Sequence, residues 1–449
     1  MSPVESSRGR EVSLKATHAG TSPWSSGAGV GLVGYYSGSK RSPSLSRGSA
    51  VSRIIDLLPP GLGGIFSPNQ GKRPLGLLGF LPQMVARSGE NSPIALACRA
   101  IATALISNLS RTAEAQSQRV LDYGKALTAA NAALGDRTLQ TQDETLTCVW
   151  LLSLYEVIVG PSAPLERSGS TSWFVHTQGL ADLLRLRGTS RFSSPVARNL
   201  FWLAYNTVQI QSFVNGVECP SESIAWFEAL EKYIDNDDMH LHRESVYGYH
   251  ASKICANGRK LIDGGHIDSL ESVLDILNVV ALLDTESYDT QIPRVSLSGS
   301  DANANSSEEA PFNLRAFISR TSYCSFRLKM HITLLELLNA LKLRFPGVQP
   351  DEVQERQRYY TAIVQALADE ILEGVPFFFP SSDSPLGGAR GGTRRWTDGL
   401  RLLWPLRLVA FWPFTRDDQR RLAQSELQRI RAECGFVKVK AAFTVPSTG

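Results

Sequence analysis

The sequence predicts an all-α protein, a large multi-helix bundle or irregular α-solenoid-like domain that follows a disordered N-terminal tail. Three observations favour this class. After residue 92 apolar residues recur at steps of three and four, several of these runs carry helix start and stop signals, and none alternates apolar and polar residues as a strand would. With 449 residues, 43% of them hydrophobic, the chain is long enough to bury a large core.

One predicted helix, residues 141–160, has no polar stripe wide enough to face water. Thr141 followed three residues later by Glu144 predicts a capping box, and Gly160 before Pro161 predicts the end of the helix. A helix that is apolar all round is normally buried on every side. We therefore expect other helices to surround this segment.

A second helix is predicted to follow at residues 173–187 and to end at Gly188, a typical C-terminal glycine. Its apolar face holds the residues Trp173, His176, Leu180, Leu183 and Leu184, and Asp182, Arg185 and Arg187 lie mostly away from it. His176 has the chemistry of a ligand or a general base. A lone histidine on an apolar face is more often a hydrogen-bonded core residue, and we favour that interpretation.

The N-terminal part of the chain differs in composition from the rest. Residues 1–53 are rich in Ser and Gly and are predicted to be disordered. The string Gly29-x-Gly31-x-x-Gly34 lies there without a flanking strand or helix, so it does not indicate a dinucleotide site. Residues 54–91 hold short apolar clusters cut by Pro and Gly. They are expected to pack as an arm on the body, the alternative being a docking segment for another protein.

The helical domain is predicted to span residues 92–445. Ser92-Pro93 and Ser194-Pro195 are start signals for two helices, because each pairs an N-cap with a proline in the first turn. Further helices are predicted at about 118–134, 221–233, 241–262, 267–284, 312–343, 351–374 and 416–434, with another around Trp404-Pro405. Internal loops are expected at about 293–311 and 380–395, and Pro376 to Pro380 is expected to form a turn.

Charge and cysteine placement limit the classes of function. Residues 1–91 hold ten Lys or Arg and four Asp or Glu, and the rest of the chain holds 36 and 39, a slight acidic excess that suits DNA poorly. The six cysteines are at least 36 positions apart and include no Cys-x-x-Cys pair, which favours buried, reduced thiols. No apolar leader and no uninterrupted apolar run of about 18 residues is present, so membrane association is not expected.

Several segments resemble the fungal-specific transcription factor domain, the helical regulatory region of fungal zinc-cluster regulators. The segments are 121–134, Asp143 to Leu146, Leu154 to Glu156, Trp173 with His176 to Gly179, Leu184 to Gly188, Ala368 to Pro376, Leu403 to Leu406, and Leu427 to Ile430 followed by Gly435. Their order and spacing carry the resemblance, which covers roughly residues 92–445. The family's N-terminal zinc cluster has no counterpart here, because the cysteine spacing does not fit one.

The resemblance implies a nuclear regulator of transcription, with control of a metabolic or secondary-metabolite pathway as one expectation. Protein partners or a homodimer are implied, and a small-molecule effector bound between helices is a further expectation. Direct DNA binding by this chain alone is not expected, so DNA contact is assigned to partners or to a missing or separate module. The alternative is a stand-alone helical ligand-binding protein or an enzyme of a metabolic pathway.

The most polar cluster, Asp235 to His242, offers carboxylates and two imidazoles, which are metal ligands by type. Acidic residues that enter a helix N-terminus need no metal to explain them, and that interpretation is favoured. No hydrolase, zinc-protease or phosphate-loop motif occurs in the predicted helical body. No catalytic, cofactor-binding or metal-ligating residue is therefore assigned from the sequence, and no cofactor is predicted.

Overall fold

A computed structural model describes residues 78–160, 172–236, 238–264, 270–285, 314–345, 350–379 and 396–436. These residues form thirteen helices and no strand, so the predicted all-α class is confirmed. The helices are α3 (Leu81–Arg87), α4 (Pro93–Ser110), α5 (Ala113–Gly135), α6 (Asp143–Val159), α7 (Ser172–Arg187), α8 (Pro195–Asn215), α9 (Ser223–Leu230), α10 (Met239–Asp263), α11 (Leu270–Thr285), α13 (Leu314–Arg344), α14 (Pro350–Phe378), α16 (Trp396–Phe411) and α17 (Asp417–Cys434). The predicted tail, residues 54–77 of the predicted arm and both predicted internal loops lie outside the described residues.

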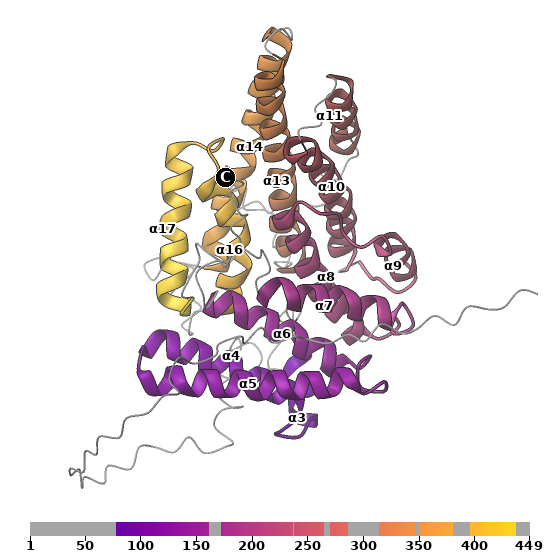
Figure 1. Cartoon of the computed structure of the whole chain (residues 1–449), viewed down its shortest axis with the longest axis vertical. Coiled ribbons are helices and arrows are strands. Elements are labelled where there is room, and N and C mark those ends of the chain that lie inside the picture. The colour runs from indigo at the N-terminus through magenta and orange to yellow at the C-terminus, as the bar shows by residue number, and fades with distance from the viewer. Residues whose placement is uncertain are drawn as a thin grey trace, which may run out of the picture.

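The helices form two groups that run in different directions. Figure 1 shows α4, α5, α6 and α7 lying across the base of the molecule, with α10, α13, α14, α16 and α17 standing above them. α10 packs along α13, α13 along α14, and α16 along α17, while α8 contacts α6, α7 and α10. Asn108 of α4 links this helix to α6 and to the end of α17. Its side-chain amide donates to the carbonyl oxygens of Ile158 (3.3 Å) and of Gly435, just after α17 (2.7 Å).

Helix α6 is the centre of the base, as its composition predicts. It contacts α4, α5, α7 and α8, and all of its residues from Thr145 to Tyr155 are buried. Its few hydroxyl groups bond to backbone carbonyls, as when Thr147 donates to Asp143 (2.7 Å) and Ser153 donates to Trp150 (2.7 Å). Burial of such a helix therefore leaves these hydroxyls satisfied.

Most predicted helix ends are confirmed because their signals are local. The hydroxyls of Ser92 and Ser194 accept hydrogen bonds from backbone amides three residues later, at 3.3 and 3.4 Å. Gly188 and Gly216 have φ angles of +58° and +62° just after α7 and α8, in the left-handed region that glycine adopts without strain.

Two predictions about local structure are wrong. Gln142, not Thr141, is the N-cap of α6, and the Thr141 carbonyl accepts a hydrogen bond from Arg187 of α7. The turn predicted from Pro376 is the last part of α14, which continues to Phe378 with that proline inside it.

The described part of the predicted arm, residues 78–91, packs on the body. The short helix α3 contains Leu81 and Val85, and Leu78 and Phe80 precede it. All four side chains are buried within the hydrophobic core. This agrees with the interpretation of the segment as a packed arm.

Among the described residues, α4 alone has the length and hydropathy of a membrane-crossing helix. It packs against α5 and α6, and Ile94, Ala100 and Ala104 are completely buried there. Helices at the centre of a bundle have the same composition, so length and hydropathy alone do not make α4 a membrane span.

Candidate ligand-binding site

A cavity of about 150 Å³ lies where the two groups of helices meet. Residues of α6, α7, α8, α10, α13 and α16 line it, together with Leu78 from the arm. Because segments that are distant in the sequence form its walls, the cavity is a product of the tertiary fold.

The walls of the cavity are largely aromatic. Trp150, Trp173, Trp202 and Trp404 come from four different helices, and each is less than 10% exposed. The indole Nε1 of Trp150 donates to the Thr207 hydroxyl at 3.2 Å, which fixes the ring of α6 against α8. Aromatic walls with a few polar groups are typical of small-molecule sites.

The space exists because short side chains face it from α13. Thr321, Ser322 and Ser325 line the cavity, and two of their hydroxyls bond to carbonyls of their own helix: Thr321 to Phe317 (3.1 Å) and Ser325 to Thr321 (2.7 Å). On the opposite wall Pro405 lies inside α16, where proline removes one intrahelical hydrogen bond.

Glu244 of α10 is the acidic group of the cavity and is 3% exposed. One carboxyl oxygen accepts a hydrogen bond of 3.5 Å from the Asn206 amide, and no ion pair is formed with any described residue. Burial raises the pKa of the carboxyl well above its ordinary value. Burial therefore favours the neutral form of this acid in the ligand-free cavity.

A second buried polar cluster joins α5, α6 and α7. The Tyr123 hydroxyl donates to the Glu156 carboxyl and lies 3.0 Å from Nε2 of His176, which is 3.8 Å from the same carboxyl. The Tyr123 ring stacks on Tyr155 with centroids 4.0 Å apart. His176 is 4% exposed, so the structure places it as the hydrogen-bonded core residue favoured from the sequence.

Burial shifts the two titratable partners of Tyr123 in opposite directions. It raises the pKa of Glu156 to about 7 and lowers the pKa of His176 to about 4. Because the Tyr123 hydroxyl uses its proton in the hydrogen bond to Glu156, its oxygen can only accept from His176. The neutral imidazole therefore donates from Nε2 to the phenol oxygen. Its Nδ1 atom is then an acceptor, and it has no hydrogen-bond partner in the described part of the chain.

Arg187 at the end of α7 forms another link to α6. Its guanidinium donates to the Thr141 carbonyl (2.9 Å) and to the Asp143 carboxylate (2.6 Å), and its side chain is 5% exposed. The sequence placed Arg187 away from the apolar face of its helix. The long side chain instead turns inward to satisfy the first turn of α6.

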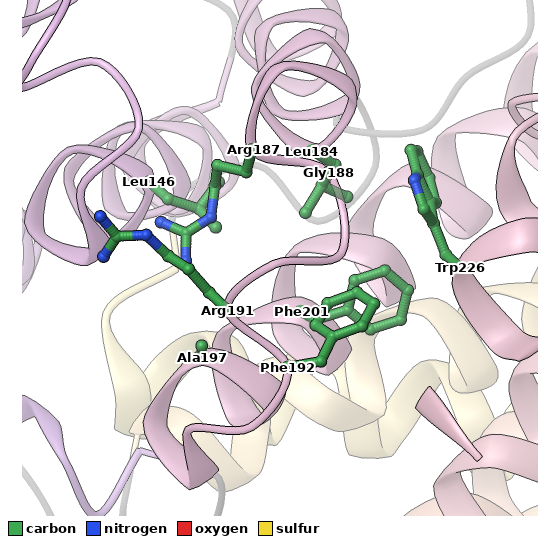
Figure 2. Close-up of a pocket in the computed structure, with 9 residues that line it drawn as sticks. All are labelled: Leu146, Leu184, Arg187, Gly188, Arg191, Phe192, Ala197, Phe201 and Trp226. Carbon is green, nitrogen blue, oxygen red and sulfur yellow. The ribbon is translucent and has the colours of Figure 1, made fainter. Parts of the chain in front are cut away.

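A crevice beside this ion pair is too small for a ligand. Figure 2 shows Arg187 and Arg191 on the side of Leu146, with the rings of Phe201 and Trp226 across from them. The crevice has a volume of about 10 Å³, close to the minimum needed for one water molecule.

The polar cluster from Asp235 to His242 does not converge on one point. Asp238 pairs with Arg198 of α8 at 3.4 Å, and His242 packs edge-on against the rings of Trp202 and Phe227. Asp237 lies outside the described residues. No group of three His, Cys, Asp or Glu side chains suited to a metal is found among the residues that the structure describes.

The cysteines are free and buried, as predicted. None of the six is in a disulfide. Burial raises the pKa of Cys98 to about 12 and that of Cys255 to about 11, so both stay thiols near pH 7.

The sequence analysis missed Glu244 and the cavity. A signal was present, because Leu241, Glu244, Ser245 and Gly248 share one face of α10 and only Glu244 on that face is charged. An acid on an otherwise apolar or small helix face indicates a buried carboxyl. What lies opposite it depends on α8, α13 and α16, which the sequence of α10 does not specify.

Comparison of the chain with protein-family models, with curated proteins and with solved structures finds no match in any of the three.

Proposed function

We propose that this chain is a nuclear regulator of transcription that resembles the effector domain of fungal zinc-cluster regulators and responds to a small molecule in its central cavity. It acts through protein partners or a homodimer, and DNA contact comes from a partner or from a separate DNA-binding module. Control of a metabolic or secondary-metabolite pathway fits this role.

One observation carries the proposal: the segments on which the resemblance rests contact one another. Tyr123, Glu156 and His176 belong to three different segments and meet in one buried hydrogen-bonded cluster. Asp143 and Arg187 belong to two of them and form an ion pair at 2.6 Å. The segments of the resemblance are thus held together in one packed helical body, which supports the proposal.

The cavity supports the regulatory part of the proposal. A ligand enclosed among six helices contacts both groups of helices at once, so its binding favours one packing of the groups over others. Such differential binding is what a ligand needs to shift a conformational equilibrium.

Chromatin immunoprecipitation of the tagged full-length protein tests the proposal. We expect enrichment at a set of promoters and nuclear localisation by microscopy of the same strain. Cytosolic protein without promoter enrichment would contradict it.

A second candidate function is a stand-alone ligand-binding protein or an enzyme of a metabolic pathway. The buried carboxyl of Glu244 in an aromatic cavity favours it, because such a site needs no DNA to act. Turnover of a bound metabolite by the purified protein would support this alternative over the first.

A further inference from the structure

We propose that the central cavity binds a compact organic amine as its cation, with the ammonium group at Glu244 and the apolar body among the tryptophan rings. The role of this amine as an effector rests on the proposed function. Its binding to the protein does not.

The volume limits the size of the ligand. The cavity measures about 150 Å³. An engineered protein cavity of about 150 Å³ accepts benzene. A molecule with one ring therefore matches the size of the cavity. A short amine-bearing chain on that ring would place its ammonium group near Glu244, which lies in the cavity wall.

The charge of the ligand follows from the surroundings of Glu244. A carboxyl buried to this degree is normally paired with a cation or bonded several times. Here the structure shows one hydrogen bond, from Asn206, and no cation from the described residues. Its other oxygen accepts no hydrogen bond from the described chain, so it is available to a ligand that brings positive charge.

The walls suit a cation as well. Indole rings are the strongest partners for cations among aromatic side chains, and the attraction grows when the site excludes water. Trp150 and Trp202 line the same cavity as Glu244 and are 4% and 2% exposed. An ammonium group beside Glu244 is thus placed among buried indole rings, where both interactions are stronger than at a fully exposed surface.

Basic groups near the cavity do not replace the ligand. Arg401 of α16 lines it but is only partly buried, so water screens its charge more than that of Glu244. His242, two positions before Glu244, faces Trp202 and Phe227, and burial lowers its pKa. Arg198 of α8 is paired with Asp238.

Binding of the cation changes the protonation of Glu244. Burial favours the neutral acid in the free protein, and an ammonium ion beside it favours the carboxylate. The acid proton then passes to the solvent, and no other bond forms or breaks. We expect protons to be released when the amine binds.

Isothermal titration calorimetry with full-length protein and two matched probes tests the proposal. The probes are 2-phenylethylamine and 2-phenylethanol, which have similar shape and differ in charge. We expect the amine to bind about tenfold or more tightly than the alcohol, a difference of about 1.4 kcal/mol. Titrations in two buffers of different ionisation enthalpy should show proton release for the amine only.

Variants locate the site. Glu244→Gln keeps the shape of the side chain, so it should abolish the preference for the amine and leave alcohol binding within about threefold. Asp263→Asn, at an exposed position on the same helix, should leave both affinities unchanged. Circular dichroism of each variant checks that it folds. If a variant does not fold, proton release by the wild-type protein still tests the proposal.

Four results would overturn the proposal: tighter binding of the alcohol, amine binding without proton release, an amine preference retained in Glu244→Gln, or absence of binding by both probes. None of these results bears on promoter occupancy, so failure of the amine assignment and failure of the proposed function are distinguishable.

Discussion

At Glu156 and His176, two buried groups titrate in opposite senses around one tyrosine. The pKa of Glu156 rises from 4.5 to about 7 on folding, so its contribution to stability is full below pH 4.5 and is lost as the pH rises through 7. The pKa of His176 falls from 6.5 to about 4, so its contribution is full above pH 6.5 and is lost as the pH falls through 4. Between pH 4.5 and 6.5 the two effects oppose each other.

Replacing Glu156 by glutamine removes the Glu156 contribution to the pH dependence of stability and keeps that of His176. Glu156→Gln keeps an acceptor for the Tyr123 hydroxyl but cannot ionise. Relative to the wild type, its free energy of unfolding should increase as the pH rises from 4.5 to 7, by up to about 3 kcal/mol. Urea unfolding of both proteins at the two ends of this range measures the difference.

Leu343 gives the control position, because it is 86% exposed and cannot ionise. Leu343→Gln adds an amide without changing any ionisable group, so it should show no such pH-dependent gain. An equal gain in both variants, or none in Glu156→Gln, would contradict the assignment of a raised pKa to Glu156.

Sequence reasoning identified His176 as a buried polar residue but not its partners. The apolar face of α7 is a local pattern, and it predicts burial of every side chain on that face. Tyr123 and Glu156 are 53 and 20 positions away from His176 and lie on other helices. Their meeting depends on how α5, α6 and α7 cross, which no local signal specifies.

At the level of elements, a glycine sets the approach of three helices. A Cβ atom at Gly248 of α10 would lie 2.6 Å from Nε2 of Gln209 on α8 and 2.8 Å from the ring of Phe326 on α13. The Gln209 amide also donates to the Ser245 carbonyl at 2.7 Å, so it is held in place. These helices therefore pack closely because this position has no side chain.

Gly248→Ala should lower the free energy of unfolding by about 1–3 kcal/mol, because the added methyl group overpacks the contact. Gly124→Ala on α5 is the matched control. A Cβ there meets nothing within 4 Å, so the change should stabilise by about 0.5–1 kcal/mol through helix propensity. Chemical denaturation of both variants measures the effects, and equal effects in the two would contradict the packing argument.

The helices themselves are predictable from the sequence where their ends carry local signals. Ser92, Ser194, Gly160 and Gly188 mark ends that the structure confirms. The predicted helix end is wrong at one place where another helix also contacts the backbone. At the start of α6 the N-cap is Gln142 and not Thr141, whose carbonyl accepts a hydrogen bond from Arg187.

At the level of the whole molecule, the cavity is the feature that sequence reasoning did not place. Burial of α6 on all sides follows from its composition. A void of about 150 Å³ follows from the relative positions of six helices and from short side chains such as Ser322 on α13. Periodicity predicts which face of a helix is buried, but it does not predict where two buried faces fail to fill the space between them.

The central claim is that a helical body with this cavity regulates transcription. It is tested most directly by fusing the full chain to an unrelated DNA-binding module and measuring a reporter gene beside the matching site. We expect reporter output to differ from that of the module alone. Ser322→Phe, which fills the cavity, should change that output, and Leu343→Phe, at an 86% exposed position on the same helix, should not. Output equal to that of the module alone, for the wild type and both variants, would contradict the claim.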